Sequence, residues 1–292
     1  MGDEGVAGSR VVITGATNGI GLLAAEALAA RGAKLAIVAR SQTRAADAVS
    51  RIRAAAGGEA TVDVLIADLA SQAAVRRVAA EVLDRYPTVD ALVNNAGAVH
   101  TTRRTTEDGI ELTWAVNHLA PFLLTTLLLG RLKASAPARI VTTTSEAHRG
   151  ARLPFEDVNA ERDYGGRGFR RYGETKLANI LFTAELARRL EGSGVTANCF
   201  HPGLVATGFN RNNGWLMALA MTVIRPFERS PEKGAETLVW LVESPEVADQ
   251  SGGYFIDRRR QTPSPAAQDA EAARRLWEIS EEQVRGSAPV GG

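Results

Sequence analysis

Tyr172 and Lys176 are four residues apart, a spacing that places two side chains on one face of a helix. A free tyrosine titrates at about 10, and a neighbouring ammonium group favours the phenolate and lowers that pKa. A tyrosine in such a pair can give or take a proton near neutral pH. The pair predicts general acid–base chemistry, and the alternative is an ordinary exposed helix face.

Two further polar residues stand in apolar surroundings. Ser145 follows an apolar run in TTTSEAH, and its hydroxyl could hold a carbonyl oxygen or simply cap a turn. Asn117 lies in VNHLAPFLLT, which reads as part of a helix. Pro121 has no N–H to offer the Asn117 carbonyl four residues earlier. The resulting bend could open a site for a water molecule, or be an incidental kink.

A glycine-rich turn follows the first apolar run, at TGATNGIG. Gly15, Gly19 and Gly21 stand between a predicted strand at 10–14 and a predicted helix at 20–31. Small residues there let the backbone approach a pyrophosphate, and the helix N-terminus adds N–H donors and a positive dipole end. The spacing G-x-x-x-G-x-G differs from the commoner G-x-G-x-x-G. The turn predicts a dinucleotide site, with packing alone as the alternative.

The residues after the next strands suggest which dinucleotide. Arg40 ends the second strand, where an NAD enzyme usually has Asp or Glu, and its guanidinium could fork onto a 2′-phosphate. This favours NADP(H) over NAD(H), although most basic residues here are arginines and Arg40 could be merely solvated. Asp68, after the third strand, could accept from an adenine amine or compete with Ser71 to cap the next helix.

Asn94-Asn95-Ala96-Gly97 follows the fourth strand. Asparagine side chains bind backbone groups and tolerate turn geometry, and Gly97 would let the chain pass close to a cofactor. A plain turn is the alternative.

Apolar runs that alternate with longer amphipathic segments must position these residues. This pattern predicts one α/β domain, a doubly wound (Rossmann) parallel sheet of about seven strands with helices on both faces. Ligands of such sheets bind beyond the carboxyl ends of the strands, where the polar residues above fall. The predicted strands are 10–14, 34–39, 61–66, 89–93, 139–143, 195–200 and 253–256, and the predicted helices are 20–31, 42–56, 72–86, 107–132, 171–190 and 231–242.

Composition excludes several classes of function. The 292 residues carry a net charge of +1, which provides no basic field for nucleic acid. One cysteine and four scattered histidines argue against a disulfide framework and a metal centre. The N-terminus lacks the pattern of a signal peptide, and the longest apolar stretch that we identify, 215–224, is too short for a transmembrane segment. We therefore expect a cytoplasmic protein.

The segment after the sixth strand should determine the substrate. Residues 209–229 gather Trp215, Met217 and Met221, and methionine adapts to irregular apolar ligands. We expect a lid at about 207–230 over a hydrophobic substrate. The alternatives are a core helix, a subunit interface of a homo-oligomer, or a helix that touches a membrane. Around this lid we expect a catalytic domain at 10–284, with flexible ends at 1–9 and 285–292.

Taken together and in order, TGATNGIG, NNAG, Asn117, Ser145, YGETK and HPGLVAT resemble the short-chain dehydrogenase/reductase superfamily. The resemblance covers about 10–284. VARS, VNHLAPFLLT, YGETKLANILF, SPEKGAETLVWL, SGGYF and RRLWEIS further resemble the branch of retinol dehydrogenases, the WW-domain oxidoreductase and light-dependent protochlorophyllide reductase. Thr144 and Thr175 replace serines that are frequent in this branch, and both keep a hydroxyl.

The resemblance implies roles for these residues. Tyr172 would donate the proton, Lys176 would lower its pKa and hold the nicotinamide ribose, and Ser145 would orient the carbonyl. Asn117 would anchor a water in a proton relay behind Lys176. Hydride would pass directly from the nicotinamide to carbon, so no metal is required. The implied cofactor contacts are Gly15, Thr17, Asn18, Gly19, Ile20, Arg40, Asp68, Leu69, Asn95, Ala96, Gly97, Tyr172, Lys176, Pro202, Gly203, Val205 and Thr207.

These observations predict an NADP(H)-dependent oxidoreductase that acts on a carbonyl or alcohol carbon of a hydrophobic small molecule. Reduction of a C=C bond is the alternative within catalysis. A catalytically silent NADP(H)-binding regulator is the alternative outside it, and would predict a damaged Tyr–Lys pair, whereas Tyr172 and Lys176 are intact.

Overall fold

The computed structural model describes residues 5–203 and 230–285. In these residues one eight-stranded sheet has the order β3-β2-β1-β4-β5-β6-β7-β8. All neighbouring strands are parallel except β7 and β8. The strands are β1 (Arg10–Thr14), β2 (Lys34–Ala39), β3 (Val62–Ile66), β4 (Ala91–Asn94), β5 (Ala138–Thr143), β6 (Val195–Phe200), β7 (Tyr254–Ile256) and β8 (Arg259–Gln261).

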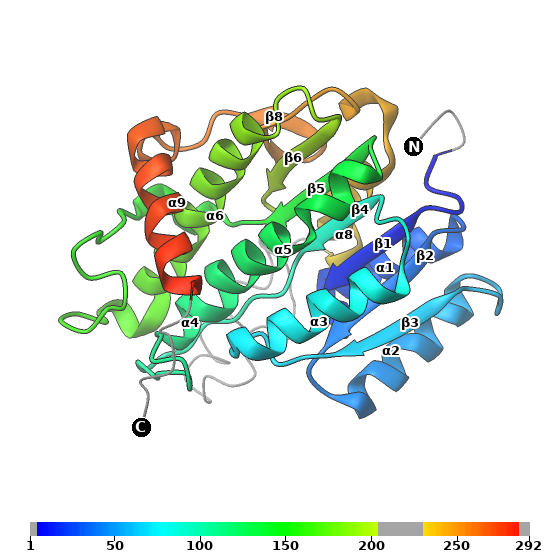
Figure 1. Cartoon of the computed structure of the whole chain (residues 1–292), viewed down its shortest axis with the longest axis horizontal. Helices are drawn as coiled ribbons and strands as arrows, with labels where there is room; N and C mark the ends of the chain where they lie inside the picture. The colour runs from blue at the N-terminus through cyan, green and yellow to red at the C-terminus, as the bar shows by residue number, and fades with distance from the viewer. Residues whose placement is uncertain (1–4, 204–229, 286–292) are drawn as a thin grey trace.

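Helices cover both faces of this sheet, which confirms the predicted doubly wound fold (Figure 1). On one face α1 packs against both α2 and α8, and on the other α3 packs against α5 and α6 against α9. The helices are α1 (Gly19–Ala30), α2 (Gln42–Ala55), α3 (Gln72–Arg85), α4 (Leu112–Trp114), α5 (Ala120–Ala134), α6 (Phe169–Arg189), α8 (Pro231–Glu243) and α9 (Ala270–Val284).

Strand β1 is buried on both faces of the sheet. Val11, Val12 and Ile13 have no exposed surface. Val12 belongs to the core under α3, α5 and α6, whereas Val11 and Ile13 belong to the core under α1 and α8. Successive side chains point to opposite faces, so a strand buried on both faces must be apolar throughout.

The predicted helix at 107–132 is wrong at its start and in its regularity. Residues 107–110 form a turn, in which the Thr106 N–H donates to the Ile110 carbonyl. The helix begins at α4, where the Glu111 carboxylate accepts from the N–H groups of Thr113 and Trp114. A π-helical turn, Ala115–Leu119, then leads into α5. The irregularity falls at Asn117, as the position of Pro121 predicts.

Two elements escaped the sequence prediction. Strand β8 is short, charged and exposed, so it lacks the apolar signal of a core strand. Helix α9, which lies beside α6 (Figure 1), begins at the Asp269 cap. The centroid of its Trp277 ring lies 5.0 Å from that of the Phe122 ring. The N-terminus is also less free than expected, because Val6 is buried and the Gly8 N–H donates to the Gly32 carbonyl.

One helical stretch in the described residues, Leu112–Ala134, is long and apolar enough to cross a membrane. It is longer than the stretch 215–224, so that stretch is not the longest apolar segment of the chain. In the most apolar window of this helix, 72% of the residues are buried inside the protein. Its apolar character is accounted for by packing in the core.

Candidate active site

The carboxyl ends of β1 and β4 are tied together beside the glycine-rich turn. The Thr14 hydroxyl accepts from the N–H groups of Asn95 and Ala96, both at 3.1 Å. The Asn95 amide donates to the Gly15 carbonyl at 3.1 Å. Asn95 therefore supports the turn through its side chain.

The glycines of this turn have different reasons to be glycine. Gly15 and Gly19 have φ of 70° and 54°, in the left-handed region that L side chains rarely adopt. A Cβ on Gly21 would lie 2.3 Å from the Gly15 carbonyl oxygen and from the Asn95 amide. Gly21 is therefore required for packing, which is the alternative interpretation of the turn given by the sequence.

The N-terminus of α1 can receive an anion. Asn18 occupies the N-cap position without a side-chain cap hydrogen bond, and the first turn has no acidic residue. The first N–H groups of a helix have no partner within the helix and attract negative charge. Thr17 and Ile20 flank this end and are partly exposed. The donor set fits a pyrophosphate.

Arg40 and Asp68 lie after β2 and β3, which are neighbours in the sheet. Both are exposed, and Leu69 is partly exposed beside Asp68. Ser71 caps α3 by accepting from the Ala74 N–H, so Asp68 is not needed as that cap. The Asp68 carboxylate instead accepts from the Ala70 N–H at 3.0 Å.

Ser145, Tyr172 and Lys176 come together after β5. The Ser145 hydroxyl hydrogen-bonds the Tyr172 side chain and accepts from the Ala147 N–H, so it also caps a turn. Lys176 Nζ lies 5.5 Å from the Tyr172 ring centroid and donates to the Thr143 carbonyl at 3.0 Å. Ser145 and Tyr172 are partly exposed, whereas Lys176 is buried.

Burial dominates the titration of the pair. It raises the pKa of Tyr172 to about 12, against which the Ser145 hydrogen bond acts in the lowering direction. It lowers the pKa of Lys176 to about 8, because an ammonium group loses hydration there. In the protein without a bound ligand, the neighbouring ammonium group therefore does not lower the pKa of Tyr172 as expected.

Asn117 is held on every side. Its side-chain oxygen accepts from the Ala98 N–H at 2.7 Å, and its amide donates to the Ala98 carbonyl at 2.8 Å and to the Thr175 hydroxyl at 3.1 Å. A Cβ on Gly97 would lie 3.4 Å from both Asn117 Oδ1 and Lys176 Nζ. Gly97 therefore lies where Asn117 and Lys176 meet.

The threonines that depart from the family pattern use their hydroxyl groups. Thr175 donates to the Tyr172 carbonyl at 2.7 Å and accepts from Asn117, so it joins two predicted catalytic residues. Thr144 donates to the Lys176 carbonyl at 2.9 Å. A hydroxyl is what both positions need.

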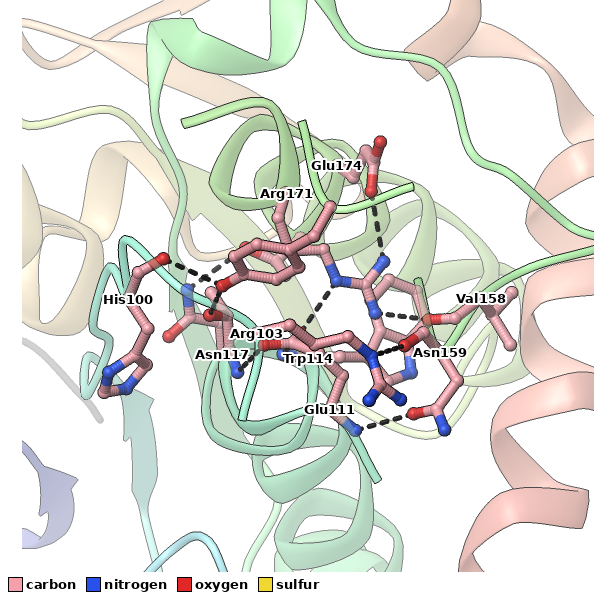
Figure 2. Close-up of polar contacts among 12 residues, drawn as sticks. His100, Arg103, Glu111, Trp114, Asn117, Val158, Asn159, Arg171 and Glu174 are labelled. Atoms are coloured by element: carbon pink, nitrogen blue, oxygen red, sulfur yellow. Dashed lines mark hydrogen bonds and ion pairs between the residues drawn. The ribbon is translucent and has the colours of Figure 1, made fainter. Parts of the chain in front are cut away.

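A buried ion-pair cluster next to Tyr172 was missed by sequence reasoning (Figure 2). Arg171 donates to Glu111 at 2.8 Å, to Glu174 at 3.1 Å and to the Val158 carbonyl, and its guanidinium stacks 4.7 Å from the Trp114 ring. Arg171 is 1% exposed. Only its position directly before Tyr172 could have drawn attention to it.

The cluster extends into the two loops that flank the site. Asn159 accepts from the Glu111 N–H at 2.6 Å (Figure 2). The Tyr164 hydroxyl donates to the His100 carbonyl at 2.8 Å. These bonds join residues 98–111 to residues 151–168. The start of α6, which carries Tyr172, is anchored to both loops.

His148 was also missed, although its neighbour Ser145 was predicted. Its Nδ1 lies 2.7 Å from the Ser145 carbonyl, and its Nε2 accepts from the Ser264 N–H at 3.2 Å. Burial lowers the pKa of His148, consistent with a neutral ring that donates from Nδ1. The ring ties the Ser145 turn to the chain after β8.

The last predicted contacts lie only partly within the described residues. Pro202 and Gly203 follow β6, and Gly203 has a φ of 87°. Val205, Thr207 and nearly all of the expected lid at about 207–230 lie outside the described residues.

The fold and this arrangement define a nicotinamide-dependent oxidoreductase of the doubly wound type. The family model of the short chain dehydrogenase matches residues 9–215, and the chain belongs to that family. Its relatives place it with the retinol dehydrogenase-like branch. Mouse retinol dehydrogenase 14 is 43% identical, covering 97% of this chain and 88% of the relative.

Two other similar proteins bear on its chemistry. A Streptomyces sp. (strain C5) protein named "Putative daunorubicin C-13 ketoreductase DnrU" is 40% identical, covering 97% of this chain and 95% of the relative. The Pseudomonas aeruginosa RhlG/NADP active-site complex has 26% identity and a TM-score of 0.70, covering 90% of this chain and 98% of that one.

Proposed function

We propose that this protein is an NADP(H)-dependent carbonyl reductase or alcohol dehydrogenase for hydrophobic small molecules. The observation that carries the proposal is the placement of Tyr172, which is hydrogen-bonded to Ser145 and followed one helical turn later by the buried Lys176. Ser145 lies beyond the carboxyl end of β5, and the glycine-rich turn lies beyond that of β1.

The geometry supports a definite division of labour. In reduction, the hydroxyls of Ser145 and Tyr172 donate to the substrate carbonyl oxygen and polarise the C=O bond. A nicotinamide bound beside the glycine-rich turn would supply the hydride that the carbonyl carbon needs. Tyr172 transfers its proton to the oxygen as the C=O bond becomes a C–OH bond. The resulting phenolate is stabilised by the Ser145 hydroxyl and by the Lys176 ammonium group.

Arg40 carries the choice of NADP(H). It is exposed at the end of β2, and the two residues that follow it, Ser41 and Gln42, are not acidic and would not repel a 2′-phosphate. The similar Pseudomonas aeruginosa RhlG structure is an NADP complex. The names of the relatives, which include retinol dehydrogenases and a ketoreductase, support an apolar alcohol or ketone as the substrate.

The test is a screen of ketones, aldehydes and enones of increasing hydrophobicity, with NADPH consumption as the measurement. The proposal is supported if apolar ketones or aldehydes are reduced, and reduced faster with NADPH than with NADH. Turnover of enones alone, with the C=C bond reduced in the product, would replace it with C=C reduction. NADPH binding without turnover of any compound would contradict an enzymatic function.

A further inference from the structure

Asn179 follows Lys176 by three residues on α6 and is 2% exposed. Its side-chain amide donates to the Asn117 carbonyl at 2.9 Å and lies 3.5 Å from the Thr143 carbonyl. We propose that Asn179 is a positioning residue for the Tyr172–Lys176 pair, because it holds the carbonyl that Lys176 binds and the carbonyl of Asn117. This inference rests on the function proposed above.

The contact with Asn117 follows from Pro121. In a regular helix the Asn117 carbonyl would accept from the N–H of residue 121, and proline has none. A buried carbonyl without a donor costs free energy, so a side-chain donor at this carbonyl is stabilising. Asn179 provides it from α6. The resemblance assigns a water molecule to Asn117, and in this chain a fixed amide donates to its carbonyl.

The contact with Thr143 links Asn179 to Lys176. Lys176 Nζ donates to the same carbonyl oxygen at 3.0 Å. A second donor at that oxygen opposes its negative potential, so less of it acts on the ammonium group. Asn179 also ties together three elements, since it stands on α6 and reaches the π-helical turn and β5. These elements carry Lys176 and Asn117 and lead directly into Ser145.

Removing the amide should have a definite electrostatic effect. The carbonyls of Thr143 and Asn117 would lose a donor, and both would become more negative toward Lys176 and Tyr172. More negative surroundings favour the ammonium form of Lys176 and disfavour the phenolate of Tyr172. The midpoints of both titrations should therefore move to higher pH.

The other titratable groups around Asn179 do not titrate near pH 8, where Lys176 does. His118 faces it with Nδ1 3.4 Å from Asn179 Oδ1, and burial lowers the pKa of His118 to about 3. Burial raises the pKa of Cys199, on β6, to about 12. Arg171 acts on His118, and its charge is paired with Glu111 and Glu174. The buried residues of α9 are uncharged: Ala273, Leu276, Trp277, Ser280 and Val284.

Two variants test the proposal. Asn179→Leu removes the donor with little change of size. Asn179→Asp keeps the size and loses the donor at neutral pH, and its charge should move the midpoints further upward. The matched control is Asn198→Leu, with Asn198→Asp for the second variant. Asn198 is also buried and also binds backbone on two sides, at Gln250 and Gly253, but stands on β6.

The first measurement needs no substrate. The chain has four lysines, so Lys176 can be followed by NMR with isotope-labelled lysine and assigned with Lys176→Met. We expect the Lys176 titration midpoint to rise by about half a unit or more in Asn179→Leu, and to be unchanged in Asn198→Leu. An unchanged midpoint in both Asn179 variants would overturn the proposal.

The second measurement is kinetic. With a substrate from the screen, Asn179→Leu should lower kcat about tenfold or more and change KM less than about twofold. A variant that melts earlier but keeps the wild-type kcat and pH profile would show a merely structural role. If Asn179→Leu does not fold, the same two measurements on Asn179→Asp decide. A wild-type protein that turns over nothing contradicts the proposed function, while the lysine titration still tests Asn179.

Discussion

The Lys176 ammonium group lies 5.5 Å from the centroid of the Tyr172 ring and donates to the Thr143 carbonyl at 3.0 Å. Among the described residues no carboxylate pairs with Lys176, and burial alone shifts its pKa. Burial meanwhile opposes the charged form of each residue, raising one pKa and lowering the other. The pair is therefore arranged so that a phenolate and an ammonium form most easily together.

Removing the Tyr172 hydroxyl should separate chemistry from binding. In Tyr172→Phe the ring remains, but the proton donor is lost, and we expect kcat to fall by about 10²–10⁴-fold. NADPH affinity, measured by fluorescence titration, should change little. Wild-type turnover in this variant would remove Tyr172 from the mechanism.

Arg40 should discriminate between the two cofactors. Its loss leaves a 2′-phosphate without a forked donor, so Arg40→Ala should raise the KM for NADPH about tenfold or more. The KM for NADH should stay within about twofold. The control is Arg53→Ala, an exposed arginine near the end of α2 that should alter neither value. Equal effects of Arg40→Ala on both cofactors would contradict the preference for NADP(H).

The sheet and most helices were predictable because short stretches of the sequence determine them. Strands buried on both faces must be apolar, and glycines or proline mark where several helices end. Helix α9 illustrates the limit, since its amphipathic sequence shows only that it covers an apolar surface. Its place against Phe122 and Phe182 depends on residues far away in the chain.

The residues of the site also differ in how far they could be predicted from the sequence. Tyr172 and Lys176 are neighbours on one helix, so their spacing is visible in the sequence. The bonds of Arg171 to Glu111 and of Asn179 to Asn117 join residues about sixty positions apart. Arginine and asparagine are usually exposed, so sequence reasoning leaves them on the surface unless the fold pairs them.

The buried ion pair beside Tyr172 should be costly to break. Arg171→Met leaves Glu111 buried without its partner, and we expect a loss of about 3–5 kcal/mol of unfolding free energy. Arg85→Met breaks partly exposed pairs with Glu81 and Asp63 and should cost about 1 kcal/mol or less. Urea denaturation of both variants measures the contrast. Equal losses would show that the Arg171 pair is not special to the fold.

Lys176 should destabilise the fold at neutral pH, and the sign follows from its pKa. The pKa is about 8 in the folded chain and about 10.4 when unfolded, so between these values the unfolded chain binds more protons. Folding stability contributed by this group therefore rises with pH across that window. Lys176→Met should be more stable than wild type at about pH 7, by on the order of 1–3 kcal/mol, and the gap should close towards about pH 10.

Lys133→Met, at an exposed lysine on α5, is the control and should show no such gap. Urea unfolding of all three proteins across this pH range is the measurement. A gap that stays constant with pH would mean that the Lys176 ammonium is not desolvated, and that Tyr172 meets a well-hydrated charge.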